Sequence, residues 1–414
     1  MSYLLCCPVC RGRFPDDGVR LHCPGGCDSL LRTLYREPHA PLDETARGIG
    51  RYHRRLPGDA RTLTAALPVV LRLPWLSREY PEFDLRVLFS GWWPKQGARM
   101  ETGSFKDLEA AAVLARLRLR PGSTLVLASA GNTAAAFATA CTRMRVPCVI
   151  VVTEEALERI RIPIPQGPEV RVIAITGGAA YDDAIALSRA LAEGGQGVLE
   201  GGVRNVARRD GMGMALGVAL EADPNMPDCY VQAIGSGAGA IAVFEAAENA
   251  RIACPELGLP RLLLAQNAPY VPVRRSYARG SRVLLREEDA TARRQIAHLF
   301  APVLSNLAPP YETAGGLYSV LRRSGGAMSA VSNAEARQAW DRFRGREGVE
   351  LDGAAAVALA SLAKLARLGL PRRVRMLLHL TGGIAPGTGL PRIPLRATVR
   401  IDRELACRSL SCGD

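Results

Sequence analysis

The sequence predicts an α/β fold with two doubly wound parallel sheets. From about Leu67 onward, short β-branched runs alternate with alanine-rich stretches whose apolar residues recur at helical spacing. The chain has 414 residues, too many for one simple core, which allows about two or three domains. Hydrophobic residues make up 48% of the chain, so each domain can bury a substantial core. We therefore expect helices on both faces of each sheet.

Strands are expected where short apolar runs rich in branched residues are bounded by turn residues. These runs are Thr124–Ala130, Pro147–Val152, Glu169–Thr176, Cys229–Ile234, Arg261–Gln266 and Val374–Leu380. The stretches between them predict helices because their apolar residues recur at helical spacing. The helical stretches are Thr133–Met144, Tyr181–Glu193, Ala238–Ala253 and Ala354–Leu368. Leu307–Thr313 and Ser324–Ala327 predict loops.

The first forty or so residues differ from the rest of the chain. Five of the eleven cysteines lie between Cys6 and Cys27, and the periodic apolar pattern is weak there. We therefore expect a separate Cys-rich, ribbon-like module ahead of the sheets. The expected domains are the module at residues 1–45, a large α/β domain at 46–110 and 216–400, a small α/β domain at 111–215, and a tail at 401–414.

Four of these cysteines have a spacing that suits a tetrahedral zinc site. Cys7 and Cys10 form C-x-x-C, and Cys23 and Cys27 follow as C-x-x-x-C around a Pro-Gly-Gly turn. The second spacing is one residue longer than usual, and another cysteine and a histidine lie next to these four. A structural zinc and a metal-free module both remain open.

The composition is strongly basic, with a formal charge of +13 and a pI near 9.5. The arginines are spread along the whole chain, and aromatic residues total only 5%, so a solvated arginine-rich surface is favoured over a nucleic-acid face. No apolar stretch reaches membrane-spanning length, and the N-terminus lacks the basic leader of a secretory signal. The odd number of scattered cysteines fits a reducing compartment. We expect a cytoplasmic protein with no nucleic-acid or membrane partner.

Lysine is rare in this chain, which makes each lysine informative. Lys95, Lys106 and Lys364 stand against fifty arginines. Lysine can form an imine and carry a proton, whereas arginine can do neither. Lys106 follows a Gly-Ser turn in ETGSFKDLEAA and begins a helical run, where the helix N-terminus and partial burial both favour a neutral amine. Lys106 is therefore the candidate for covalent amine chemistry, with a surface cation as the alternative.

Two further segments place small and polar residues between a strand and a helix. In LASAGNTAAAFA, the amides of the turn and the hydroxyls of Ser129 and Thr133 suit a substrate carboxylate, although an ordinary capped turn is the alternative. In QAIGSGAGAIAVFEAA, the loop from Gly235 to Gly239 suits a phosphate at a helix start. An acidic ribose partner is not clearly positioned after this loop, so a phosphate ester is favoured over a dinucleotide.

A fourth segment, MLLHLTGGIAPG, ends a buried-looking strand at Thr381 and two glycines. A hydroxyl at the carboxyl end of a strand can bond a pyridine nitrogen without protonating it, which favours elimination over transamination. A structural threonine in a turn is the alternative.

Together, the ordered segments SFK, SAGNTAAAFA, GSGAG and TGG resemble the pyridoxal-phosphate (PLP) enzymes that include threonine synthase, O-acetylserine sulfhydrylase and the tryptophan synthase β subunit. The resemblance runs from about Leu67 to Pro391. It implies the tryptophan synthase β-like fold, with the site in the cleft between the two domains, and pyridoxal 5′-phosphate held as an imine by Lys106. The implied ligands are Asn132 for the pyridine 3′-oxygen, Ser129, Gly131 and Thr133 for the substrate carboxylate, Gly235, Ser236, Gly237, Ala238 and Gly239 for the cofactor phosphate, and Thr381 for the pyridine nitrogen.

One segment separates branches of this family. Threonine synthases carry a pattern like N-P-x-R-x-E-G-Q-K-T, whereas NVARRDGMGMA keeps Asn205, Arg208 and Gly211 but has Met-Gly-Met where Q-K-T belongs. This departure, together with FSGWWPKQGARMETGSFKDLEA, resembles the branch that replaces the phosphate of O-phospho-L-serine with sulfite to give L-cysteate, a step towards coenzyme M. Threonine formation from O-phosphohomoserine, or another PLP-dependent replacement or lyase reaction, is the alternative.

The phosphoserine reaction expels one anion and adds another, so it calls for fixed cations near the β-carbon. The candidates flank the motif segments and are Arg208, Arg209, Lys95 and Arg99, with a surface or structural charge as the alternative for each. The resemblance also implies a homodimer and a Cys-rich module away from the active site. A non-enzymatic zinc-ribbon protein that binds nucleic acid is the alternative of another class, and Lys106 with the four ordered segments counts against it.

Overall fold

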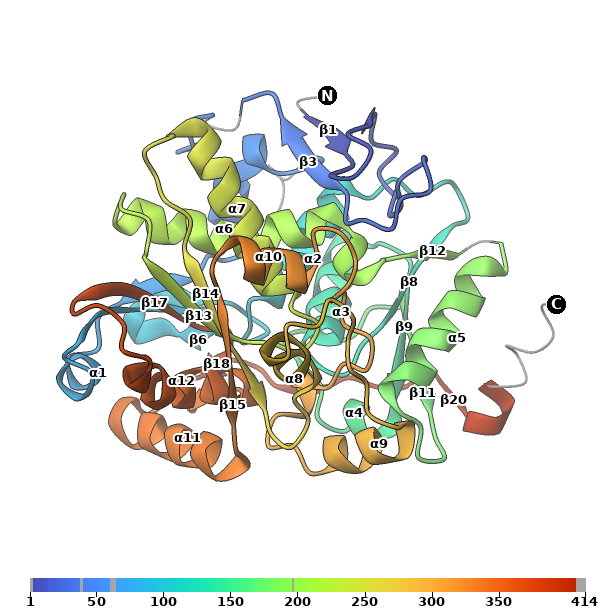
Figure 1. The fold of residues 1–414 in the computed structure, drawn as a ribbon. Helices are drawn as coiled ribbons and strands as arrows, with labels where there is room; N and C mark the ends of the chain where they lie inside the picture. The colour runs from blue at the N-terminus through green and yellow to red at the C-terminus, as the bar shows by residue number, and fades with distance from the viewer. Residues whose placement is uncertain (1–2, 38–39, 60–64, 196, 407–414) are drawn as a thin grey trace.

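The computed structural model describes residues 3–37, 40–59, 65–195 and 197–406. Two parallel sheets lie side by side, each covered by helices on both faces, with a small three-stranded sheet at the N-terminus (Figure 1). This arrangement confirms the α/β fold with two doubly wound domains and an N-terminal module. Within the described ranges, no helix is long and apolar enough to cross a membrane.

The large sheet has six strands in the order β15-β14-β13-β17-β5-β4. Five of them are parallel, and only β4 at the edge runs antiparallel to its neighbour β5. Helices α6, α7 and α10 lie on one face, and α11 and α12 lie on the other (Figure 1). The strands are β4 (Val69–Leu71), β5 (Phe83–Phe89), β13 (Cys229–Ala233), β14 (Arg261–Asn267), β15 (Ala327–Val331) and β17 (Val374–Leu380), and the helices are α6 (Val206–Ala222), α7 (Ala238–Ala253), α10 (Leu317–Arg323), α11 (Asn333–Glu347) and α12 (Gly353–Leu365).

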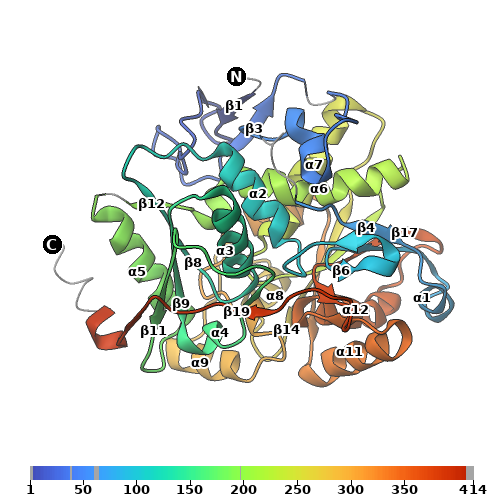
Figure 2. The same ribbon diagram turned by 180° about the vertical axis from the view of Figure 1, so that it is seen from behind.

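The small sheet has five parallel strands in the order β12-β8-β9-β11-β20. Alternate side chains of its central strands face opposite sides: Leu125 and Ile150 pack with the main core around α3, whereas Val126 and Val151 pack against α5. Figure 2 shows α3 and α5 on opposite sides of this sheet. The elements are β8 (Thr124–Ala128), α3 (Asn132–Met144), β9 (Cys148–Thr153), α4 (Glu154–Leu157), β11 (Val170–Ile175), α5 (Tyr181–Glu193), β12 (Gly197–Leu199) and β20 (Val399–Ile401).

The C-terminal segment returns to the small sheet. Strand β19 (Ile393–Pro394) pairs with β10 (Arg161–Ile162), and β20 pairs in parallel with β11. The sequence had placed residues up to 400 in the large domain, whereas residues 393–401 pack with the small one, because two-residue and three-residue edge strands leave little periodic signal. The other expected boundaries stay a proposal, and residues 407–414 of the expected tail lie outside the described residues.

The N-terminal sheet, in the order β2-β1-β3, sits on α6 and α2. The ion pair between Asp16 and Arg116 anchors it, because both side chains are buried and Arg116 Nη2 donates to Asp16 Oδ1 at 2.7 Å. The remaining elements are β1 (Tyr3–Cys6), β2 (Arg13–Phe14), β3 (Arg32–Tyr35), η1 (Gly48–Arg55), α1 (Pro74–Glu79), β6 (Trp92–Trp93), η2 (Pro94–Gln96), β7 (Ala98–Arg99), α2 (Lys106–Arg116), η3 (Gly202–Arg204), α8 (Pro272–Ala278), α9 (Asp289–Ala297), η4 (Pro302–Leu304), β16 (Glu350–Leu351), η5 (Ala366–Leu368) and β18 (Gly383–Ile384).

Candidate active site

A cavity of about 830 Å³ lies between the two sheets. Its walls come from loops that follow the carboxyl ends of strands in both sheets, where ligands bind in open α/β folds. Ser129 follows β8, Glu200 follows β12, Gly235 follows β13 and Thr381 follows β17. Topology therefore gathers the expected motifs at one place, although they are far apart in the sequence.

Lys106 is the first residue of α2 and lines the cavity. The Phe105 amide donates to the Thr381 carbonyl at 3.0 Å, which ties the start of α2 to the end of β17. Lys106 Nζ donates to Glu109 Oε2 at 2.6 Å, and its side chain is only 16% exposed. Burial lowers the pKa of Lys106, as expected for an amine that must be neutral to react.

Glu109 belongs to a buried cluster of four charged groups. Arg208 on α6 donates from Nε and Nη2 to Glu200 at 2.9 and 2.7 Å, and its Nη2 lies 2.9 Å from Glu109 Oε1. Burial raises the pKa of Glu109, but Arg208 and then Lys106 outweigh it and lower that pKa overall. The two cations and two carboxylates thus balance one another away from bulk water.

The turn after β8 caps helix α3 and also lines the cavity. Ser129 Oγ accepts hydrogen bonds from the amides of Gly131 at 3.1 Å and Ala134 at 2.9 Å, so this hydroxyl caps α3. Asn132 and Thr133 also line the cavity, and first-turn amides have no partner within their own helix. Because Ser129 Oγ already accepts from Gly131 and Ala134, the amides of Asn132 and Thr133 are the ones placed to receive a carboxylate.

The glycine loop after β13 needs its small residues. Gly237 has φ +76° and immediately precedes α7, and a Cβ atom there would lie 2.3 Å from Leu317 Cδ2. A Cβ atom at Gly239 would lie 2.6 Å from Gln232 Nε2. Gly235, Ser236 and Ala238 line the cavity with them, so a concave cradle of backbone faces the cavity at a helix start.

Thr381 is 3% exposed and lines the cavity beside Asp352. Asp352 caps α12 by accepting from the Ala355 amide at 2.6 Å, and Asn132 Nδ2 donates to its other oxygen at 3.2 Å. Burial raises the pKa of Asp352. Sequence reasoning missed Asp352, because a capping aspartate looks the same in any helix.

The four expected anion-binding cations have different surroundings. Arg208 lines the cavity, whereas Arg209 is absent from its wall and donates to Glu245 at 2.8 Å and to the carbonyls of Val203 and Leu31. Lys95 and Arg99 are exposed and lie outside the cavity wall.

Three arginines that the sequence did not single out do line the cavity, namely Arg189, Arg204 and Arg286. Helical spacing could have revealed Arg189, because it lies on the same face of α5 as Tyr181 and Ile185, which also line the cavity.

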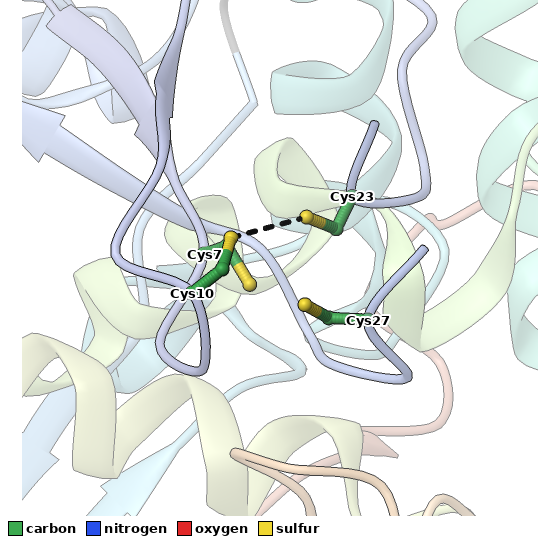
Figure 3. Close-up of side chains that lie close together, drawn as sticks. All are labelled: Cys7, Cys10, Cys23 and Cys27. Atoms are coloured by element: carbon green, nitrogen blue, oxygen red, sulfur yellow. Dashed lines mark hydrogen bonds between the residues drawn. The ribbon is translucent and has the colours of Figure 1, made fainter. Parts of the chain in front are cut away.

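The N-terminal cysteines converge as their spacing predicts. The Sγ atoms of Cys7, Cys10, Cys23 and Cys27 all lie within 4.8 Å of one another, and Figure 3 shows them pointing into a common space. The Sγ atoms of Cys10 and Cys23 are 3.6 Å apart. Ligands about 2.3 Å from a tetrahedral zinc have similar separations, so the four thiols fit one zinc ion.

The Cys-rich module also reaches the active site. Leu21, His22 and Asp28 belong to the cavity wall, and Asp28 forms an ion pair with Arg204 at 2.6 Å. The expectation that the module lies away from the active site is therefore wrong. The second cysteine pair sits on a loop that packs against η3, which sequence spacing alone does not reveal.

A family model of pyridoxal-phosphate dependent enzymes matches residues 80–382. The chain belongs to this family. Lys106, the small-residue cradle and Thr381 fit the amine, phosphate and ring-nitrogen partners that such a cofactor needs. The protein is thus a PLP-dependent enzyme, and the non-enzymatic alternative is wrong.

Within the family, the chain is similar to cysteate synthases over nearly its whole length. It is 42% identical to cysteate synthase of Methanoculleus marisnigri over 97% of this chain and 93% of the relative. It is 38% identical to cysteate synthase of Methanosarcina acetivorans over 92% of each chain. These relatives confirm the resemblance to this branch.

Other enzymes of known structure share the fold at low sequence identity. Maize serine racemase matches with a TM-score of 0.58 and 17% identity over 78% of this chain and 89% of its own. A fungal L-serine ammonia-lyase from Rhizomucor miehei matches with a TM-score of 0.59 and 16% identity over 77% of this chain and 93% of its own. These likenesses support the tryptophan synthase β-like architecture.

Proposed function

We propose that this enzyme converts O-phospho-L-serine and sulfite into L-cysteate and phosphate. The observation that carries the proposal is the match to cysteate synthases across the Cys-rich module, both sheets and the cleft between them. The Met-Gly-Met segment on α6 supports it, because threonine synthases carry Q-K-T there.

PLP, when bound, supplies an electron sink for the carbanion that forms when the substrate loses its α-proton. Lys106 holds the cofactor and, once substrate displaces it, its neutral amine takes the α-proton. Phosphate then leaves the β-carbon, the sulfur of sulfite bonds to that carbon, and Lys106 Nζ returns the proton to the α-carbon. Burial supports this role because it lowers the pKa of Lys106 and so makes the neutral amine easier to form.

The other residues orient the reactants. The turn containing Ser129, Gly131 and Thr133 would hold the substrate carboxylate, and Asn132 of the same turn would hold the pyridine 3′-oxygen of the cofactor. The loop from Gly235 to Gly239 holds the cofactor phosphate at the start of α7. Thr381 would hold the ring nitrogen through its hydroxyl without protonating it.

Arg208 is the cation proposed to meet the departing phosphate and the entering sulfite. It lines the cavity, and its Nη1 carries no hydrogen bond to any described residue, while Nε and Nη2 are held by Glu200 and Glu109. Arg209, Lys95 and Arg99 are left out of this role because they lie outside the cavity wall.

A structural zinc at Cys7, Cys10, Cys23 and Cys27 and a homodimer complete the proposal. Family resemblance supports the dimer. None of the nine cysteines among the described residues forms a disulfide, which supports placing the protein in the cytoplasm.

The test uses purified, PLP-loaded protein given O-phospho-L-serine with and without sulfite, and measures released phosphate. We expect release that depends on sulfite and falls by roughly 100-fold or more in Lys106→Ala. Lys364→Ala is the matched control, because Lys364 pairs with Glu335 outside the cavity wall and its loss leaves turnover unchanged. Absence of sulfite-dependent phosphate release, or an unaffected Lys106→Ala, contradicts the proposal.

A further inference from the structure

Glu109 is a buried carboxylate beside the reactive lysine for which the proposed reaction has so far given no role. Its side chain is 0% exposed and lies one helical turn after Lys106, on the same face of α2. An isolated buried carboxylate is strongly unfavourable, so this position requires fixed positive partners. Both partners, Lys106 and Arg208, belong to the active site.

We propose that Glu109 is the positioning residue that holds Lys106 as the base and proton carrier of the reaction. This inference rests on the proposed function in one respect, namely that Lys106 is the cofactor lysine. Glu109 accepts from Nζ at 2.6 Å, and Arg208 Nη2 forms an ion pair with its other oxygen at 2.9 Å, so the carboxylate lies between the amine and a second fixed cation.

The charge balance of the cluster explains what Glu109 does. Arg208 is held between Glu109 and Glu200, which leaves one negative charge for Lys106 to neutralise. When Lys106 takes the α-proton, the C–H bond breaks and an N–H bond forms on Nζ, and the bound cofactor would supply the electron sink for the electron pair of that C–H bond. The new ammonium group is then paired with Glu109, which stays ionised, and the proton is kept for return to the α-carbon.

Charged and titratable groups surround Lys106 and its partners from several elements. Glu109 comes from α2, Arg208 from α6, Glu200 from the end of β12, Tyr181 from α5 and Asp352 from the start of α12. Burial lowers the pKa of Lys106, while Glu109 acts in the opposite direction and Arg208 adds to the lowering. Removing the Glu109 charge therefore makes Lys106 a weaker base.

The test compares Glu109→Gln with Glu335→Gln in the PLP-loaded enzyme. The control removes the carboxylate from the second Lys–Glu pair, in which Lys364 Nζ lies 2.7 Å from Glu335 on the surface. We expect Glu109→Gln to lower kcat by roughly tenfold or more, with KM changed less than about twofold, and to move the acid limb of the kcat profile to lower pH. Glu335→Gln should change neither.

A second readout is the chemical labelling of lysine side chains, which can be followed one by one because the chain has only three lysines. In the full chain without cofactor, pH-dependent acylation followed by mass spectrometry gives the reactivity of Lys106, with Lys95 and Lys364 as internal references. Glu109→Gln should increase Lys106 labelling at neutral pH, and Glu109→Asp, which keeps the charge, should restore most of the kcat. If Glu109→Gln does not fold, the inference is tested with Glu109→Asp alone. That variant must then show a smaller shift, in the same direction, of the acid limb of the kcat profile and of Lys106 labelling.

The inference is overturned if Lys106 carries the cofactor but Glu109→Gln matches Glu335→Gln in both the pH profile and the labelling. Failure of the proposed function gives a different result, because borohydride then fixes the cofactor at Lys95 or Lys364, or no cysteate forms in the wild type.

Discussion

At the scale of single residues, two neighbouring arginines on α6 contact different parts of the molecule. Arg208 and Arg209 are consecutive, so their side chains leave the helix about 100° apart. Arg208 reaches Glu109 and Glu200 at the cavity, whereas Arg209 reaches Glu245 and the carbonyls of Val203 and Leu31. One position therefore faces the cavity and the next joins the Cys-rich module to α6.

Substituting these two arginines should separate their roles. Arg209→Ala leaves Glu245 buried without that ion pair, so we expect a loss of about 3–5 kcal/mol in stability, measured by denaturant unfolding. Arg208→Ala should lower kcat/KM for O-phospho-L-serine by roughly 100-fold while the cofactor stays bound, as checked by its visible absorption. If the two substitutions lowered kcat/KM equally under conditions where both variants are fully folded, Arg208 and Arg209 would not have separate roles.

The same residue scale explains which site features could be predicted. Lys106 was identifiable because lysine is rare in this chain and the residue opens a helix after a Gly-Ser turn. Glu109 and Glu200 were not, since their importance arises only when α2, α6 and the end of β12 pack together. Arg208 and Arg209 looked equivalent in sequence because orientation around a helix depends on packing.

At the scale of elements, the proposed zinc ion at the four cysteines would stabilise the sheet formed by β1, β2 and β3. A small sheet with few core residues gains much of its stability from a bound metal. We expect a chelator to lower the melting temperature by at least about 5 °C before it affects turnover, and Cys10→Ser to abolish that response. Cys254→Ser is the control, because Cys254 lies outside the cluster; a chelator-insensitive wild type free of zinc would contradict the proposed metal.

The contact between β3 and α6 should carry a pH dependence. Burial raises the pKa of Asp210 to about 6, although Thr33 and Tyr35 donate to its carboxylate at 2.5 and 2.7 Å. The unfolded chain has a pKa of about 3.9, so the folded state holds this proton more tightly and loses stability as pH rises from about 4 to about 6.

Asp210→Asn removes that ionisation and keeps an acceptor for both hydroxyl groups. The melting temperature of the variant relative to wild type should therefore be higher at pH 7 than at pH 4. Asp341→Asn, the same change at an exposed position, should show no such trend. A variant whose relative stability is greater at pH 4 than at pH 7 would exclude a buried ionisation at Asp210.

Elements with a strong local pattern of apolar residues could be predicted from the sequence. Strands that are determined by their neighbours in the sheet could not. Val374–Leu380, Tyr181–Glu193 and Ala238–Ala253 have the bounds expected from the sequence, because each is a long run of one periodicity. Strand β5, with charged residues inside FDLRVLF, and β15, with the weakly apolar AMSAV, were missed. Both are defined by their partners in the sheet, a long-range property that a local pattern does not contain.

At the scale of the whole molecule, the active site is a product of topology. Motifs from about residue 106 to residue 381 meet because both sheets direct the carboxyl ends of their strands into one cleft. The Cys-rich module closes part of the same cavity through Leu21, His22 and Asp28. The order of motifs predicted this fold and cofactor, whereas the choice of electrophile and nucleophile depends on how side chains from distant segments line the cleft.

The most direct test of the proposed reaction is a competition in one vessel. The PLP-loaded enzyme is given equal amounts of O-phospho-L-serine and O-phosphohomoserine with sulfite, and the amino-acid products are identified by mass spectrometry. We predict L-cysteate, formed in step with the released phosphate, and no threonine above the level made without enzyme. Threonine as the main product, with sulfite left unconsumed, would contradict the account.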